Sequence, residues 1–356
     1  EPVTPLLASV AATGYEHLFR NLGRAFGVGE PRLAAVEHAL RHLTGVHGGR
    51  LYYDLTSVRE VLGAAPFGDV LQALFERYVG AASTSPAPTR RRWRDGLDLL
   101  RIAGRVAWQY RDLDARVRRF EATVDAYARE TTPARLRAAS QAELVARLRG
   151  FVDVRSRWTD AGLADVAAMV TSGLLGALLE RALPDRSDQA LVARLLTGLE
   201  DLASARPVEG LWSLSRLARE RDVDDLLAGE PDDRRALAAL PPGLRDALDG
   251  WLEAWGYRCS GELMLTTPTL QDEPWRALAL VRAYARDDGE APATRAARQA
   301  VGRRAAEREV EAALRAASGR AAVAAFRALL AGTRASITAR ERARQRQALL
   351  YARLRA

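Results

Sequence analysis

Long stretches rich in alanine, leucine and arginine run through this chain, and residues 256–274 interrupt them most sharply. These three residue types favour helix, so most of the chain is constrained to pack as helices. The interrupting stretch contains two glycines, two prolines, three threonines, the only cysteine and the charged pair Arg258 and Glu262. Binding and catalytic residues are often carried by loops on a rigid scaffold. We therefore expect chemistry or recognition at this loop.

The composition supports an all-α fold. The chain has 356 residues, of which 48% are hydrophobic and 6% aromatic. It is long enough to bury more than one packed unit, and it has few of the residues that favour sheet. One segment departs from helix, because Tyr52 and Tyr53 follow the pair Gly48-Gly49, a pattern typical of a turn and extended chain. We predict a multi-helix protein with at most a very short extended segment near residues 50–54.

Prolines and helix boundaries suggest the domain organisation. Pro2 and Pro5 disfavour a clean helix start. Residues 1–13 are therefore predicted to be a linker and residues 14–356 a helical domain, with possible sub-units 14–158 and 159–356. Thr56 is predicted to cap the helix that follows the extended segment. Beyond residue 289 the sequence predicts helices that alternate with short turns. The other helices are predicted at about residues 14–27, 31–45, 93–129, 141–158, 160–183, 207–220, 231–239, 241–254 and 275–286.

All 53 basic residues are arginine, and the net charge is +8. The lack of lysine excludes a Schiff-base lysine, a Walker lysine and a Ser-Lys dyad. The planar arginine fork suits phosphate and carboxylate. Exposed arginine is also ordinary on helices, and a coding bias toward arginine explains the composition equally well.

Cysteine usage and apolar runs predict a cytoplasmic location. The single cysteine, Cys259, cannot form a disulfide within the chain and suits a reducing compartment. The first residues lack the basic region of a signal peptide. The longest apolar run, from Val166 to Leu179, is shorter than the about 20 residues of a membrane span. We interpret it as a buried helix and expect no membrane partner.

Two groups of side chains suggest metal binding, and each has a simpler interpretation. His38 and His42 lie four residues apart on a predicted helix and would suit zinc, but no nearby motif completes the ligand set. The acidic runs at residues 222–225 and 232–233 resemble the Asp-rich magnesium clusters of helical terpene synthases. No second metal motif accompanies them, and aspartates are common at helix starts. We predict no metal site in this chain.

Two segments near residue 90 have weaker signals. The run Arg90-Arg91-Arg92-Trp93-Arg94 has the charge and the aromatic residue of a nucleic-acid contact, but it is short and isolated. We interpret it as the solvated start of a helix and expect no nucleic-acid partner. Residues 81–89 are rich in serine, proline and alanine, which is typical of a flexible loop or lid.

The last predicted helix has an arginine-bearing face. Arg340, Arg344, Gln347 and Tyr351 follow the spacing i, i+4, i+7 and i+11, so they share one side of a helix. Two guanidinium groups on one face are suited to stabilise a transferring phosphoryl group. A solvated arginine-rich helix would have the same spacing.

Five stretches, in this order, resemble the central region of the phosphoenolpyruvate synthase-like dikinases, above all the rifampin phosphotransferases. Each stretch alone is a loose match, and the ordered set, which extends over nearly the whole chain, is more specific. The stretches are Glu1-Pro2-Val3-Thr4-Pro5-Leu6, Gly49-Arg50-Leu51-Tyr52-Tyr53-Asp54-Leu55, Leu196-Thr197-Gly198-Leu199, residues 256–274, and Arg334-x-x-Ile337-x-x-Arg340-Glu341-x-x-Arg344.

The resemblance implies a role within a larger enzyme. Complete family members combine an ATP-grasp domain, a helical substrate-binding domain and a domain with a phosphorylated histidine. They convert ATP to AMP and phosphate and pass the β-phosphoryl group through the histidine to the acceptor. This chain would be the acceptor-binding domain, with ATP and Mg²⁺ required by the whole enzyme and no cofactor in this chain. Its partners would be a small-molecule acceptor and the two other domains.

The resemblance also implies site residues. Arg340 and Arg344 would steady the phosphoryl group, while Arg258 and Glu262 would shape the acceptor site. Tyr257 stands where the family has a histidine and would donate a hydrogen bond without acting as a base near neutral pH. An apolar pocket is expected between the helix at 160–183 and the 256–274 stretch. The remaining expected substrate-binding residues are Met264, Met169, Glu341 and Tyr351.

Three other classes of protein remain open from the sequence. A helical module could bind an apolar small molecule without catalysis. A scaffold could use its arginine face for acidic partners. A magnesium-dependent terpene-type enzyme could use the acidic runs.

Overall fold

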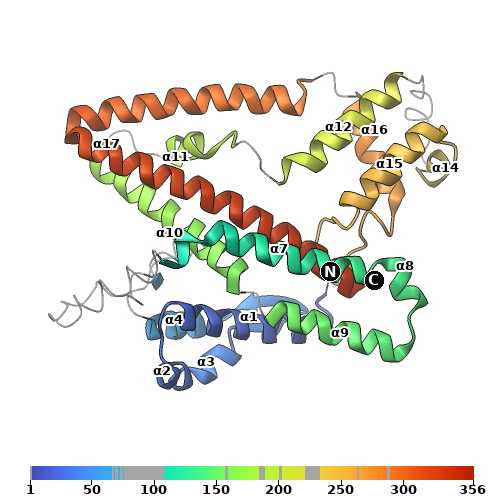
Figure 1. Cartoon of the computed structure of the whole chain (residues 1–356), viewed down its shortest axis with the longest axis horizontal. Helices are drawn as coiled ribbons and strands as arrows, with labels where there is room; N and C mark the ends of the chain where they lie inside the picture. Colours follow the sequence, from blue (N-terminus) through green and yellow to red (C-terminus); the bar gives the residue numbers. More distant parts are fainter. Residues whose placement is uncertain are drawn as a thin grey trace. The chain divides into compact units, whose positions relative to one another are not determined.

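A computed structural model describes the chain at residues 2–65, 68, 71–72, 75, 108–156, 159–183, 189–199, 203–220, 233–262, 264–286 and 289–356. Within these residues the protein is helical apart from one two-stranded hairpin (Figure 1), which confirms the all-α prediction. The chain forms two compact units. Unit 1 contains Glu1–Leu178 and Arg327–Ala343, and unit 2 contains Leu179–Phe326 and Arg344–Ala356. The predicted division into a linker and a helical domain stays a prediction.

The first helix, α1 (Pro5–Ala25), begins earlier than the sequence predicts. The hydroxyl of Thr4 accepts a hydrogen bond from the backbone N–H of Leu7 at 3.2 Å and so caps the helix. Proline at the first helical position lacks only an N–H that would have no partner in the helix. The prolines therefore permit a helix start here. Among the described residues, unit 1 also contains α2 (Glu30–Ala35), α3 (Glu37–Arg41), α4 (Leu55–Ala64), α7 (Leu113–Glu130), α8 (Pro133–Ala138) and α9 (Gln141–Ser156).

A β-hairpin follows α3. Its strands, β1 (Thr44–His47) and β2 (Arg50–Tyr53), are antiparallel, with Thr44 opposite Tyr53 and His47 opposite Arg50. Gly48 and Gly49 both have positive φ, 56° and 73°, as a tight two-residue hairpin turn requires. The extended segment near residues 50–54 is confirmed, whereas the helix predicted to run to residue 45 ends at Arg41.

The cap of α4 corrects the prediction for Thr56. Asp54 is the N-cap: its carboxylate accepts the Thr56 N–H at 2.9 Å and the Ser57 hydroxyl at 2.8 Å. Thr56 lies inside the first turn and donates to the cap. The hydrogen bond from Ser57 is the largest cause of the lowered pKa of Asp54.

Replacing Asp54 by alanine is expected to lower the free energy of unfolding by about 1 kcal/mol at neutral pH, because the cap is lost. A lowered pKa in the folded state makes this contribution complete above the unfolded value of about 3.9. It is lost as the pH falls through the folded pKa. Urea unfolding of the wild type and the variant should therefore differ at pH 7, and the two should converge once the pH has fallen below the lowered folded pKa. Asp54→Asn, which keeps an acceptor oxygen, should lose less stability; an alanine effect independent of pH would contradict the assignment.

The core of unit 1 places α1 beside α3 and α9. Leu40 and Val58 are fully buried in a cluster against which Tyr15 and Phe19 of α1 pack. From α9, the buried Arg155 donates to the backbone carbonyl of Val10 on α1. Such a buried charge requires hydrogen-bond partners to remain in the core.

Unit 2 contains a helical cluster of its own, formed by α12 (Ala205–Glu220), α14 (Asp233–Ala238), α15 (Pro242–Trp255) and α16 (Pro274–Arg286). The Trp251 indole donates to the Pro207 carbonyl at 3.1 Å. Arg216 donates to the Tyr284 carbonyl at 2.7 Å, close to the C-terminal end of α16. A positive charge is favourable at that end of a helix. Two arginine-to-carbonyl contacts, from Arg216 and Arg219, thus hold α12 against α16.

Three further helices complete the described chain: α10 (Thr159–Ala182), α11 (Gln189–Leu196) and α17 (Pro292–Arg355). α17 is interrupted only at Gly319, whose φ is 79°. After residue 289 the structure has two helices that meet at Gly319, so the predicted alternation of helix and turn occurs at this one position. Alanine and arginine sustain helix across Gly302 and Gly332, where the chain does not turn. The unit boundaries fall inside α10 and α17, so each of these helices contributes residues to both units.

Length and composition alone would allow one helical stretch, Gln141–Ala182, to cross a membrane. Its most apolar window has a mean hydropathy of 1.7, and 39% of that window is buried in the structure. A buried core helix passes the same test. The expected absence of a membrane partner stays a prediction.

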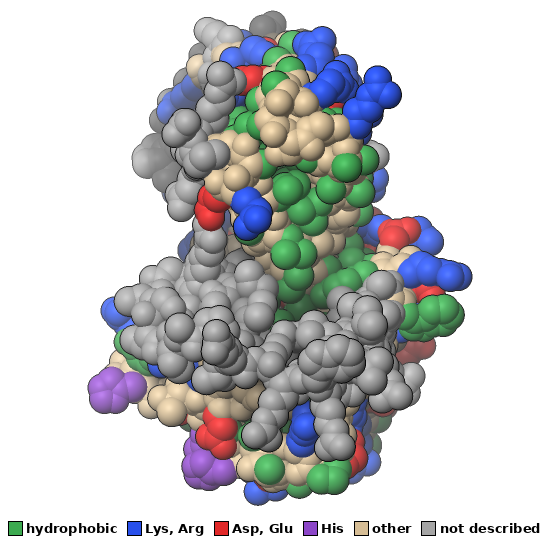
Figure 2. Space-filling model, turned by 90° about the vertical axis from the view of Figure 1, so that its left-hand side faces the viewer, with side chains coloured by type: hydrophobic (Ala, Val, Ile, Leu, Met, Phe, Trp, Pro, Cys, Tyr) green, Lys and Arg blue, Asp and Glu red, His purple; other side chains and the backbone are tan. Residues whose placement is uncertain are grey.

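On the face shown in Figure 2, arginine side chains are spread out and interspersed with acidic ones. The scaffold hypothesis, in which an arginine-rich face recognises acidic partners, stays a prediction.

Candidate functional site

The loop between α15 and α16 is closed on itself by backbone hydrogen bonds. The N–H of Gly256 donates to the Leu252 carbonyl at 2.7 Å and ends α15. The N–H of Gln271 then donates to the Gly256 carbonyl at 2.7 Å, and the N–H of Leu270 to the Arg258 carbonyl at 3.0 Å. Both ends of the loop are therefore tied together. We call residues 256–273 the site loop.

A threonine and an aspartate hold the C-terminal end of the site loop, next to α16. The Asp272 carboxylate accepts the N–H of Thr269 at 2.8 Å and its hydroxyl at 2.7 Å. The N–H of Asp272 donates back to the Thr269 hydroxyl at 3.2 Å. Thr269 is buried and Asp272 is exposed, so the aspartate satisfies the polar groups of the buried threonine from the surface.

The structure brings Arg258 and Glu262 together in an ion pair between the Arg258 Nε and the Glu262 carboxylate. About a third of each side chain is exposed (32% and 31%), so the pair lies at the surface of the loop. Tyr257, the preceding residue, is 3% exposed and belongs to the core. The charged pair is therefore partly open to solvent, as are the exposed side chains of Ser260, Thr266 and Asp272 in the same loop.

The C-terminal end of α17 supports the site loop. Arg355 donates to the backbone carbonyl of Met264, and both residues belong to unit 2. Tyr351 and Gln347 are buried on the same helix. Arg355 lies outside the predicted arginine face, so this contact does not test whether that face and the site loop form one site.

The predicted arginine face lies on an unbroken part of α17, so its helical spacing holds. The environments of its members differ. Arg340 belongs to unit 1, whereas Arg344 belongs to unit 2, where it is exposed. Gln347 and Tyr351 are buried. The face as a whole is therefore not a solvated arginine surface, and its clamp role stays a prediction.

Arg340 makes an ion pair with α10. Its Nε donates to the Asp165 Oδ1 at 2.8 Å, and the two side chains are 25% and 34% exposed. Met169 follows Asp165 by four residues on α10, so both lie on one side of that helix. Glu341 is half-buried beside Arg340 in the sequence. Met169, Arg340 and Glu341 all belong to unit 1, whereas the other predicted site residues belong to unit 2. The expected pocket between α10 and the site loop stays a prediction.

Sequence reasoning missed Arg342 of α17, which contacts two acidic side chains. Arg342 contacts the Glu121 carboxylate and donates to Asp114 at 2.7 Å, both on α7. The hydrogen bond with Glu121 is the largest cause of its raised pKa. Spacing along one helix gave no signal for this contact, because its partners lie far away in the sequence.

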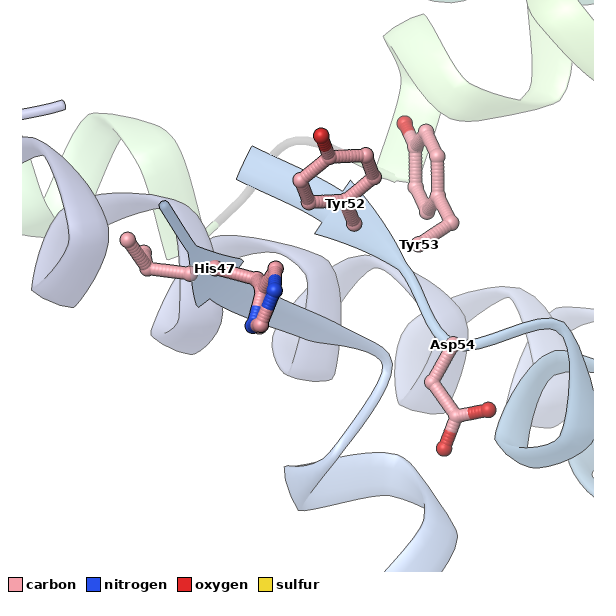
Figure 3. A pocket seen from close by; sticks show the side chains of 6 residues that line it. His47, Tyr52, Tyr53 and Asp54 are labelled. Carbon is pink, nitrogen blue, oxygen red and sulfur yellow. The ribbon is translucent and has the colours of Figure 1, made fainter. Parts of the chain in front are cut away.

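A shallow hollow of about 320 Å³ lies on the hairpin of unit 1 (Figure 3). Tyr52 and Tyr53 extend from β2, His47 comes from β1, and Asp54 lies where β2 ends. The Tyr53 hydroxyl donates to the Tyr15 hydroxyl at 2.5 Å, which holds that ring against α1. Exposed aromatic rings such as these can stack on a planar or apolar group. The sequence predicted extended chain here but no hollow.

The histidine pair has a contact of its own. His38 and His42 are exposed, their rings stack with centroids 4.2 Å apart, and the His42 Nδ1 lies 2.7 Å from the His38 carbonyl. Within the residues that the structure describes, no group of three or more His, Cys, Asp or Glu side chains could hold a metal ion. Four predicted features have side chains that lie outside the described residues. They are the acidic runs at 222–225 and 232–233, the basic run at 90–94 and the loop at 81–89.

Two comparisons with known proteins bear on this arrangement. The family model described as rifampicin phosphotransferase fourth domain matches residues 162–341, half of the chain. This range includes Met169, the whole site loop, Arg340 and Glu341, while Arg344 and Tyr351 lie just beyond it. No curated protein matches the chain.

Proposed function

Because the chain belongs to the rifampicin phosphotransferase fourth-domain family, we propose that it binds the acceptor in an ATP-dependent phosphotransferase of the dikinase type. The acceptor would be a hydroxyl-bearing, largely apolar compound of the rifamycin class. The family match carries this proposal, since it includes the site loop and the Arg340–Glu341 segment that the resemblance assigns to the site.

In the proposed reaction, the β-phosphoryl group of ATP moves to a histidine on another domain of the enzyme, AMP leaves, and water takes up the γ-phosphoryl group, which is released as phosphate. An acceptor hydroxyl oxygen then attacks the phosphorus on that histidine, the P–N bond breaks, and the hydroxyl proton is released. The overall products are AMP, phosphate and the phosphorylated acceptor. Mg²⁺ would neutralise the phosphate charges of ATP. As the family resemblance implies, ATP and Mg²⁺ would be bound by the partner domains, which would work with this chain in the cytoplasm.

The residues of this chain would bind and orient the reactants. Arg340 and Arg344 would stabilise the negative charge of the transferring phosphoryl group, which matters most where charge develops in the transition state. The Arg258–Glu262 pair offers both a donor and an acceptor to a polyhydroxylated ligand. The expected contacts of Tyr257, Met264, Met169, Glu341 and Tyr351 with the acceptor belong to the same proposal.

Titrating the 356-residue chain with rifampicin in a calorimeter tests acceptor binding without the other domains. We expect saturable one-to-one binding. We expect Glu262→Ala to weaken it about tenfold, equivalent to about 1.4 kcal/mol, because the variant also leaves Arg258 without its carboxylate partner.

Arg245 and Asp249 provide the matched control, since they form another i,i+4 ion pair, on the preceding helix, with a contact of 2.9 Å. Asp249→Ala should leave rifampicin binding unchanged. No binding by the wild-type chain would reject the rifamycin acceptor. Equal losses from both variants would show that the effect is not specific to the site loop.

The alternative of a non-catalytic binding module predicts the same titration. The two are separated by adding ATP to the enzyme that contains this chain. A phosphotransferase forms AMP and a phosphorylated antibiotic, whereas a binding module leaves both reactants intact.

A further inference from the structure

We propose that Asp165 is a positioning residue for Arg340, holding its guanidinium in the orientation in which it binds the transferring phosphoryl group. This inference rests on the proposed function, which places Arg340 in the phosphoryl clamp. Its basis is the 2.8 Å contact from the Arg340 Nε to the Asp165 Oδ1. Both residues belong to unit 1.

A contact at Nε is suited to orient an arginine. The guanidinium is planar, so a hydrogen bond to its Nε–H restricts both the direction of the plane and rotation about the adjoining bond. The carboxylate acceptor makes this bond charge-assisted and short. An arginine ordered in advance does not have to be ordered while the phosphoryl group transfers, which is how preorganised charges lower a barrier.

The exposure of the pair argues against a purely structural role. The Arg340 and Asp165 side chains are 25% and 34% exposed, so solvent, and hence a ligand, has access to them. An ion pair at this level of exposure contributes little to stability, typically below about 1 kcal/mol. The carboxylate can therefore be removed without unfolding the chain, and an effect on catalysis can be measured.

Charge and position predict opposite effects of removing Asp165. If the carboxylate only lowered the local positive potential, its loss would strengthen the attraction of Arg340 for a phosphoryl group. If it orients Arg340, its loss allows the guanidinium to move and slows the transfer. The direction of the change therefore tests the proposal.

A second pair on α10 is a close structural match. The Arg116 Nη1 donates to the Asp160 Oδ1 at 3.1 Å, with side chains 23% and 24% exposed. It joins α10 to α7 in the same unit but does not involve α17. Replacing Asp160 by alanine thus removes an equivalent ion pair without touching Arg340.

The experiment measures kcat and the KM of rifampicin in the enzyme that contains this chain together with its ATP-grasp and phosphohistidine domains. For Asp165→Ala we expect kcat to fall about 10- to 100-fold, the cost of a small misplacement of a reacting group, with the KM unchanged. Asp165→Asn keeps an oxygen that accepts the Nε–H and should recover most of the rate. Asp160→Ala should match the wild type.

Four outcomes decide the matter. Asp165→Ala at or above the wild-type rate overturns the inference, as does an asparagine variant no faster than alanine. If Arg340→Ala loses activity while Asp165→Ala does not, the clamp stands and only the positioning role fails. If Arg340→Ala also keeps the wild-type rate, the assigned clamp itself is wrong.

A readout in the 356-residue chain does not depend on activity. The Nε–H of Arg340 should give an NMR signal protected from exchange with water in the wild type and in Asp160→Ala. In Asp165→Ala the exchange of this proton should be faster. Unchanged exchange would show that Asp165 does not hold the guanidinium.

Discussion

An Arg340→Ala enzyme is expected to transfer phosphate about 100- to 1000-fold more slowly than the wild type, the typical loss for one preorganised donor to a developing charge. The interaction is proposed to act on the phosphoryl group during transfer, so kcat should fall while rifampicin binding to the chain is retained. Product formation from ATP and rifampicin gives the rate, and calorimetry gives the binding constant. The double variant Arg340→Ala/Arg344→Ala should be at least as slow.

Arg342 provides the control for this prediction, because it lies two residues further along α17 and has a side-chain exposure of 24% against 25% for Arg340. Its guanidinium joins α17 to Glu121 and Asp114 of α7, a role in packing. Arg342→Ala should lower the thermal midpoint and keep kcat. If Arg342→Ala were the slower enzyme, the clamp would have been assigned to the wrong arginine.

Gly198→Ala is expected to destabilise the protein by about 3 kcal/mol, since two costs of roughly 1–3 kcal/mol each combine. Gly198 has a φ of +60°, a region that side chains disfavour. An added Cβ would also lie 2.8 Å from the Gln299 Cβ and 2.9 Å from the backbone nitrogen of Ala300. The carbonyl of Gly198 accepts a hydrogen bond from the buried Arg303 of α17, so the turn cannot move away freely. Urea unfolding monitored by circular dichroism measures the loss.

Gly319→Ala separates the two costs. Gly319 has a similar positive φ, +79°, but an added Cβ would have no neighbour within 4 Å. Only the backbone strain remains; with a ψ of -172° it is the strain of a region that is essentially restricted to glycine, so the expected loss is roughly 1–3 kcal/mol. No loss of stability at Gly319 would contradict this account of the strain.

The helices could be predicted well where the apolar periodicity is local. The sequence predicted α10, α15 and α16 almost to their boundaries, because proline, glycine and cap residues mark their ends. The sequence-based prediction failed at Pro5, and after residue 289 it did not show that helix continues across Gly302 and Gly332. At the start of α1, the cap at Thr4 allowed a helix to begin at a proline. In α17, the summed helix propensity of alanine and arginine outweighed single glycines.

The candidate site was predictable in part. The pairing of Arg258 with Glu262 follows from a spacing of four residues in a tight loop, and the structure contains that contact. The attachment of the site loop to Arg355 does not follow from any local pattern, since its partner Met264 lies in a different element. The hollow on the hairpin was also missed, because an outward-facing tyrosine and one packed on Tyr15 look alike in sequence.

The sequence by itself determined that this chain is helical, that residues 256–274 interrupt the helices, and that its ordered motifs resemble one family of phosphotransferases. Helix propensity and loop residues act over a few neighbours, so they can be read along the chain. Only the tertiary structure decided what each arginine does. Arg155 and Arg303 are buried against carbonyls, Arg342 joins α17 to α7, and Arg340 meets Asp165. Because every Lys or Arg position in this chain is arginine, the residue type does not show which arginine has which role. The partner that folding brings next to each arginine distinguishes their roles.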